Sequence, residues 1–222
     1  MMIGNLLDLG LRDYREVWEL QLKLVSLRAT GQIHDTLILV EHPHVFTVGK
    51  AVSEKIPAEI GRVPVIQIER GGQWTYHGPG QLVGYPILDL SARGRDVHNF
   101  VWSIEETLIR ALDEFEIKAG RIEGKGKTGV WVGKTKIASI GAAIRNWITF
   151  HGFALNVNTD MSYFAMIEPC GMPGSGMISM KTLLNENVDF NKVKRTVLQE
   201  FADLFHLNLT IEIDPIASIT GL

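Results

Sequence analysis

Three separate segments of this 222-residue chain repeat apolar residues at helical spacing, and the sequence between them favours strands. In residues 96–115 the apolar positions follow one another in steps of three and four, which places them on one face of a helix. Asp96 stands where an N-cap residue can accept a hydrogen bond from the first turn. The same spacing predicts helices over residues 11–29 and 189–205. Long helices set apart around a strand-rich middle are typical of an α+β fold rather than of regular βαβ alternation.

The first of these helices is expected to be more buried than an ordinary surface helix. Its apolar face consists of Leu11, Tyr14, Trp18, Leu22 and Val25. A second apolar row, formed by Leu20, Leu24 and Leu27, follows the same spacing on the other side. We therefore expect its later turns to be buried on all sides.

Apolar runs bounded by glycine and proline predict the strands. They cover residues 36–43, 63–72, 81–90, 147–157 and 207–214. Residues 129–141 read as a β-hairpin, because Gly133-Lys134 suits a two-residue turn with glycine first. Lys136 then projects from a strand just after this turn.

Composition narrows the class of protein. Hydrophobic residues make up 45% and charged residues 21%, as in a soluble globular protein, and no linker divides the chain, so we expect one domain over residues 1–222. The N-terminus resembles no signal peptide, and no uncharged apolar run reaches the ~18 residues of a membrane helix. A single cysteine allows no internal disulfide, which favours the cytoplasm. The net charge of −3 argues against a nucleic-acid partner.

Two familiar kinds of site are disfavoured by spacing. A phosphate-binding P-loop needs glycine five positions before the glycine of GK[ST], but Arg121 precedes Gly126-Lys127-Thr128 and Thr128 precedes the second GKT at 133–135. Both segments are expected to be turns. His42 and His44 are two apart and could share a strand face, yet no third ligand stands at a recognisable spacing. We therefore expect no metal.

Residues 70–82, RGGQWTYHGPGQL, concentrate glycine and proline between Arg70 and His77. Glycine lets backbone N–H groups approach a ligand closely. The segment therefore predicts either a ligand-binding loop or a tight turn that joins two strands, and the polar residues favour the binding loop.

Cys170, the only cysteine, lies in the glycine- and proline-rich stretch MIEPCGMPGSG. A thiol attacks as its thiolate, and an ordinary cysteine pKa of ~8.5 leaves only a few per cent ionised at neutral pH. A nucleophilic Cys170 would therefore need a partner, and His77, His151 and Lys136 all remain candidates. The alternative is an inert, buried small residue.

Three motifs together resemble one family, the octanoyltransferases of lipoate biosynthesis. RGGQWTYHGPGQL resembles the family's RGG-x-x-T-x-H-x-PGQ signature, KTKIASIG resembles its K-I-A-x-IG segment, and HGFALNV with EPCG resembles its HG-x-ALNV and PCG pair. They occur in the family's order and cover most of residues 40–175. The combination is highly specific, whereas any one motif alone is weak.

The resemblance implies a mixed β-sheet with packed helices, as in the biotin and lipoate protein ligases. It also implies that Cys170 accepts the acyl group and that Lys136 lowers the pKa of its thiol. The residues implied to line the acyl pocket are Arg70, Gly71, Gly72, Gln73, Trp74, Thr75, Tyr76, His77, Ser139, Ile140, Gly141, Gly152, Phe153 and Ala154. Trp74 departs from the family pattern, since a smaller apolar residue is common there, and it implies a different local shape of the pocket.

The implied reaction moves an octanoyl group from octanoyl-acyl carrier protein, through a Cys170 thioester, to a lysine of a lipoyl domain. The implied acceptors are the E2 subunits of 2-oxoacid dehydrogenases and the glycine cleavage H protein, with no cofactor. Two alternatives remain: an ATP-dependent lipoate or biotin protein ligase of the same fold, and a non-catalytic module that binds acyl or lipoyl carriers. Neither alternative needs Cys170 as a nucleophile.

Overall fold

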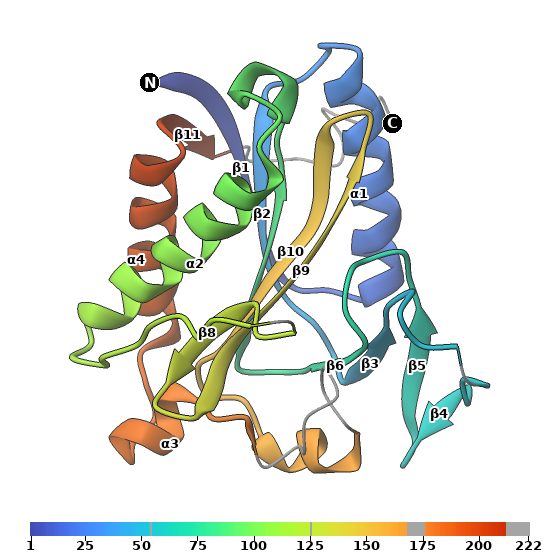
Figure 1. Ribbon diagram of the computed structural model, residues 1–222, viewed down its shortest axis with the longest axis vertical. Coiled ribbons are helices and arrows are strands. Elements are labelled where there is room, and N and C mark those ends of the chain that lie inside the picture. The colour runs from blue at the N-terminus through green and yellow to red at the C-terminus, as the bar shows by residue number, and fades with distance from the viewer. Residues whose placement is uncertain (54, 125, 168–175, 212–222) are drawn as a thin grey trace.

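The computed structural model describes residues 1–53, 55–124, 126–167 and 176–211, and a seven-stranded mixed sheet is its largest element (Figure 1). The strand order is β11-β1-β2-β7-β10-β9-β8. Parallel pairing joins β1 to both β11 and β2, and the other neighbours are antiparallel. The strands are β1 (Met2–Leu11), β2 (Asp35–Glu41), β7 (Gln81–Ile87), β8 (Gly129–Val132), β9 (Thr135–Arg145), β10 (Ile148–Asn156) and β11 (Leu207–Ile211).

Both faces of this sheet are covered, and β2 shows how the sequence achieves it. Leu37 and Leu39 point into one hydrophobic cluster, while Ile38 and Val40 point into another on the opposite face. Successive side chains of a strand alternate between faces, so a strand buried on both sides reads as the continuous apolar run that predicted it. The strand prediction for this segment is confirmed.

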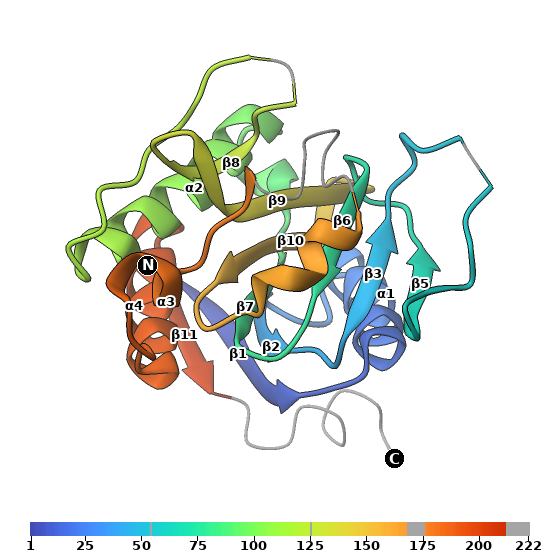
Figure 2. The same cartoon turned by 90° about the horizontal axis from the view of Figure 1, so that it is seen from below.

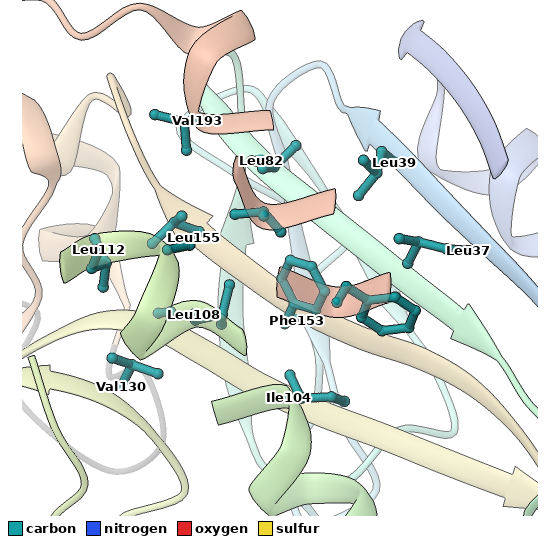
Figure 3. Close-up of a cluster of buried hydrophobic side chains, with 14 of the residues drawn as sticks. Leu37, Leu39, Leu82, Ile104, Leu108, Leu112, Val130, Phe153, Leu155 and Val193 are labelled. Carbon is teal, nitrogen blue, oxygen red and sulfur yellow. The ribbon is translucent and has the colours of Figure 1, made fainter. Parts of the chain in front are cut away.

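Helices α2 (Val97–Asp113) and α4 (Phe190–Leu204) cover one face (Figure 1). Ile104 and Leu108 of α2 and Val193 of α4 pack with the sheet residues Leu82, Phe153 and Leu155 (Figure 3). The Asp96 carboxylate accepts from Asn99 N–H at 2.8 Å, so the predicted cap of α2 is confirmed. The predicted late helix is confirmed as α4.

Helix α1 (Tyr14–Ala29) covers the other face, and here the sequence prediction was partly wrong. Leu11 belongs to the end of β1 and is exposed, because Asp13 caps a helix that begins at Tyr14. The buried face is Tyr14, Val17, Gln21, Leu24 and Val25. The later turns are not buried on all sides, since Lys23 and Ser26 are exposed.

A second, four-stranded sheet lies beside the end of α1 (Figures 1 and 2). Its strands, in the order β4-β5-β3-β6, are β4 (Glu59–Ile60), β5 (Val63–Gln67), β3 (Val45–Val48) and β6 (Trp74–His77). The sequence predicted only β5 of these four. A strand, β6, occupies the centre of the glycine-rich segment and pairs antiparallel with β3.

Short helices complete the described elements. They are η1 (Leu90–Arg93), η2 (Met161–Met166) and α3 (Met180–Leu184). Within the described residues, no helix has the length and apolar character needed to cross a bilayer.

Candidate active site

A narrow pocket is lined by the loop after β5 and by strands β6, β9 and β10. Figure 2 shows β6 lying beside β9 and β10. Within the pocket, the volume in which the centre of a water molecule fits is about 40 Å³. Eleven of the fourteen pocket residues named from the sequence line it: Arg70, Gly71, Gly72, Thr75, His77, Ser139, Ile140, Gly141, Gly152, Phe153 and Ala154. Three segments that are distant in the sequence therefore meet in one cavity.

Small residues allow the loop and the sheet to approach. Gly71 N–H donates to Ala142 O at 3.3 Å, which joins the loop to β9. A Cβ at Gly141 would stand 3.2 Å from Gly71 O, tighter than most such contacts. On the next strand, Gly152 faces Gly84, and a Cβ there would overlap the Gly84 carbonyl oxygen. Glycine is therefore needed at these positions to leave room for neighbouring backbone.

The Arg70 side chain holds the glycine loop against the small sheet. Its Nη2 donates to Thr47 O at 2.9 Å and to Thr47 Oγ1 at 3.0 Å, and Nη1 donates to Gly71 O at 2.9 Å. The side chain is buried. Arg70 thus fixes the position of Gly71 relative to β3, and it also places a positive charge beside the pocket.

The remaining three predicted pocket residues lie elsewhere, and strand alternation explains two of them. In β6, Thr75 and His77 face the pocket, so Trp74 and Tyr76 face the other way. Tyr76 is fully buried with its hydroxyl 2.7 Å from His44 Nδ1. Gln73 and Trp74 line a separate surface hollow.

Three pocket residues were absent from the set named from the sequence: Tyr14, Tyr85 and His151. Tyr14 looked like one more apolar residue of a helix face, and Tyr85 like part of a buried strand. The sequence predicts His151 only as a candidate partner for the thiol. Its place inside the HG-x-ALNV motif was the one signal that could have indicated the pocket.

A hydrogen-bond chain fixes the tautomer of His77. Gln81 Nε2 donates to Tyr76 O at 3.1 Å and to Asn156 Oδ1 at 2.9 Å, so Gln81 Oε1 is the atom that faces His77 Nδ1 at 2.8 Å. An amide oxygen only accepts, and His77 Nδ1 must therefore carry a proton. Burial lowers the pKa of His77 to about 3. His77 is thus neutral at pH 7, with Nε2 as an acceptor.

His42, behind the pocket, is held in the same tautomer. Its Nδ1 lies 2.8 Å from Arg12 O, an atom that only accepts, and its Nε2 lies 2.8 Å from the Tyr85 hydroxyl. Burial lowers its pKa to about 4. Nε2 therefore accepts from Tyr85, which orients that hydroxyl at the pocket wall.

The buried histidines predict an acid-sensitive fold. The pKa values of His42, His77 and His151 fall from 6.5 to about 4, 3 and 3 on folding, mainly through burial. Below about pH 6.5 the unfolded chain binds protons that the folded chain does not, so stability is full above this pH and is lost as pH falls toward 3.

Urea unfolding at pH 7, 6 and 5 measures this loss. In His77→Gln the slope of unfolding free energy against pH between 6.5 and 5 is expected to fall by up to about 1.4 kcal/mol per pH unit. An unchanged slope would contradict the role of burial at His77.

A β-bulge determines where Lys136 points. Opposite β8, Val130 pairs with Ala138 and Trp131 pairs with Lys136, so Ile137 is an extra residue in β9. Ile137 and Ala138 accordingly both point into the α2 side of the sheet. Lys136 therefore lies on the opposite face, the face of Ser139 and Gly141, which it would not share under plain alternation.

The Lys136 side chain is only 1% exposed. Nζ donates to Thr128 O at 3.0 Å and lies 4.8 Å from the centre of the Trp131 ring. A Cβ at Gly129 would stand 3.2 Å from Lys136 Cε, so the absence of a side chain there makes room for the lysine. A lysine amino group is seldom buried this deeply, and buried ionisable groups are candidates for function.

Cys170 lies outside the described residues, and its role remains a prediction. The chain that follows returns to Lys136: Met177 bridges to Lys136, and Ile178 N–H donates to Lys136 O at 3.0 Å. Ile167 and Met177, described on either side of residues 168–175, share one hydrophobic cluster with Phe46 and Tyr76. The described residues Ile167 and Met177 therefore both pack beside β3 and β6.

Comparisons with known proteins agree on a class. Residues 13–202 match the family described as the lipoyl protein ligase A/B catalytic domain. A putative lipoate protein ligase from T. acidophilum with bound lipoic acid is 15% identical with a TM-score of 0.73, over 95% of this chain and 89% of the other. The biotin protein ligase from Aquifex aeolicus in complex with biotin and ATP is 13% identical with a TM-score of 0.56, over 91% and 70%. The fold is therefore that of the lipoate and biotin protein ligases, and the α+β prediction with a mixed sheet is confirmed.

Closer relatives narrow this class. The octanoyltransferase of Thermoanaerobacter sp. strain X514 is 44% identical over 99% of this chain and 98% of the relative. That of Syntrophotalea carbinolica is 45% identical over 89% and 92%. The chain belongs to the octanoyltransferase family of protein lipoylation, which confirms the resemblance carried by its motifs.

Proposed function

We propose that this octanoyltransferase works through a covalent octanoyl thioester on Cys170, with octanoyl-acyl carrier protein as donor. The acceptors are lysines on the lipoyl domains of 2-oxoacid dehydrogenase E2 subunits and on the glycine cleavage H protein, and the reaction takes place in the cytoplasm. The observation that carries this proposal is the buried Lys136, turned by the bulge toward the face that holds the pocket.

In the first half-reaction the Cys170 thiolate attacks the carbonyl carbon of the donor thioester. A C–S bond to Cys170 forms and the C–S bond to the carrier breaks. The thiol proton of Cys170 ends on the released carrier thiol. One thioester replaces another, so this step is nearly balanced in free energy and needs no ATP. The Lys136 ammonium would favour the thiolate by its positive charge.

In the second half-reaction the amine of the acceptor lysine attacks the Cys170 thioester. A C–N bond forms, the C–S bond breaks, and the amine proton passes to the Cys170 sulfur. The neutral form of Lys136 would take this proton as general base and return it. The amide product is much more stable than the thioester, and transfer therefore runs forward.

The pocket suits the acyl chain. Ala154 contributes apolar lining and glycines at 71, 141 and 152 keep the cavity narrow but open, whereas the Ile140 and Phe153 side chains pack on the α2 side of the sheet. Each methylene removed from water contributes about 0.8 kcal/mol, so a slot for eight carbons supplies useful binding energy. Arg70, Thr75 and His77 place polar groups along the same wall.

Transfer without ATP tests the proposal. The protein, octanoyl-acyl carrier protein and a lipoyl domain are mixed in the absence of nucleotide, and octanoyl-lysine on the lipoyl domain is measured by mass spectrometry. We expect full modification with the wild type and none with Cys170→Ser. Dependence on ATP and free octanoate, with an active Cys170→Ser, would indicate a ligase. Absence of any transfer would indicate a binding module.

A further inference from the structure

Two buried polar side chains of the pocket have no hydrogen-bond partner among the described residues. They are Thr75, through Oγ1, and His151, through both Nδ1 and Nε2. Thr75 is 6% exposed and His151 is 1% exposed. Buried polar atoms in folded proteins nearly always have a partner, often a bound water. Both side chains therefore offer unused hydrogen-bonding capacity inside one pocket.

The His151 ring is held firmly in this place. Its backbone N–H donates to Gln21 Oε1 of α1 at 2.7 Å, and its backbone adopts a left-handed φ of 54°. The ring lies 4.9 Å from that of Phe150, between centroids, and Nε2 lies 3.8 Å from Glu69 Oε2. Burial and the charge of Arg70 lower its pKa to about 3, so the ring is neutral and offers one donor and one acceptor.

Strand register places this polar end away from Lys136. His151 pairs with Ala142 in β9, six positions beyond Lys136. Strand residues advance by about 3.3 Å and Ile137 is the extra residue of the bulge, so the two ends of the site are roughly 17 Å apart along β9. An extended octanoyl chain has seven C–C bonds of about 1.5 Å, and its zigzag covers roughly 9 Å of that span. The Lys136 side chain takes up part of the rest. Ser139, Ile140 and Gly141 line the interval.

We propose that Thr75 and His151 hold a water that forms a polar floor at the far end of the acyl pocket and sets the chain-length limit. This inference rests on the proposed function, since it assumes that the acyl carbonyl lies at the Lys136 end. A chain that ends above the floor leaves the water in place. A longer chain must displace it and press its methyl end against Thr75 Oγ1 and the imidazole, which leaves buried polar atoms unsatisfied.

Thr75→Val tests the floor with little change of shape, because valine replaces the hydroxyl by a methyl group. Octanoyl-, decanoyl- and dodecanoyl-acyl carrier protein are supplied separately, and kcat/KM for transfer to a lipoyl domain is measured for each. In Thr75→Val the ratio of kcat/KM for decanoyl to kcat/KM for octanoyl is expected to rise about tenfold. This factor corresponds to the free-energy cost of leaving one buried hydrogen-bonding group unsatisfied, which the valine removes. His151→Leu is expected to raise the same ratio.

Two controls separate this role from a general loss of packing. Thr75→Ser keeps the hydroxyl and should keep the wild-type ratio. Thr107→Val makes the same substitution at a buried threonine of α2, outside the pocket, and should leave the ratio unchanged. If Thr75→Val forms the octanoyl product but its ratio stays at the wild-type value, the floor is refuted while the proposed function stands. If the wild type transfers no octanoyl group, the proposed function itself has failed.

Discussion

Lys136→Met is expected to lower kcat/KM for octanoyl transfer by about 10²–10⁴, the usual contribution of a general acid–base group. Methionine resembles lysine in length, so it can still contact Trp131 and fill the space beside Gly129. In the proposed mechanism it loses the charge that would favour the thiolate and the amine that would take the proton of the acceptor. The rates of both half-reactions should fall. They are measured by rapid-quench kinetics with the donor alone and with the donor plus the lipoyl domain.

Lys134→Met is the matched control for this substitution. Lys134 lies two residues away in the exposed hairpin turn, so the same chemical change there should leave the rate unchanged. A cooperative thermal transition for Lys136→Met would show that the fold persists. Wild-type transfer by a folded Lys136→Met would remove this lysine from the mechanism.

Gly152→Ala is expected to destabilise the protein by about 3 kcal/mol, at the upper end of ordinary overpacking. Gly152 lies in β10 between β7 and β9, and a Cβ there would overlap the Gly84 carbonyl oxygen and stand 2.6 Å from Pro86 Cδ. Backbone and a proline ring cannot rotate away as a flexible side chain could. The strands would have to separate at the pocket wall. Urea unfolding measures the loss.

Gly120→Ala provides the comparison for the glycine effect. No atom lies within 4 Å of a Cβ at this position, and its φ is outside the left-handed region. The free energy of unfolding should therefore stay within about 0.5 kcal/mol of the wild type. Equal losses at the two glycines would mean that close approach to β7 is not the reason for glycine at 152.

Periodicity predicted the elements whose burial comes from one regular face. The helix at 96–115 appears as α2 with its Asp96 cap, and the hairpin at 129–141 turns at Gly133-Lys134 as expected. Strand β1 was missed, because its exposed and buried residues follow no simple alternation and Leu11 mimics the next helix face. Strand β6 was missed because glycine and proline surround it, and only pairing with β3 makes it a strand.

The motifs predicted which segments meet in the pocket, but not which side chains point into it. Two local features that composition does not show determine which side chains face the pocket. They are the alternation of side chains within β6 and the extra residue Ile137 in β9. Among the described residues the ring nitrogens of His151 have no hydrogen-bond partner, and its neighbours come from α1 and the loop after β5 as well as from β10. Such a setting depends on tertiary contacts and could not be read from spacing.

The most direct test of the central claim is the intact mass of the protein after mixing with octanoyl-acyl carrier protein alone. The account predicts a gain of about 126 Da, an octanoyl group in place of one proton, located on the peptide that contains Cys170 and absent in Cys170→Ala. Addition of a lipoyl domain should remove this mass from the protein and add it to the acceptor lysine. Transfer to the lipoyl domain without any mass gain on the protein, or an undiminished gain in Cys170→Ala, would contradict the account.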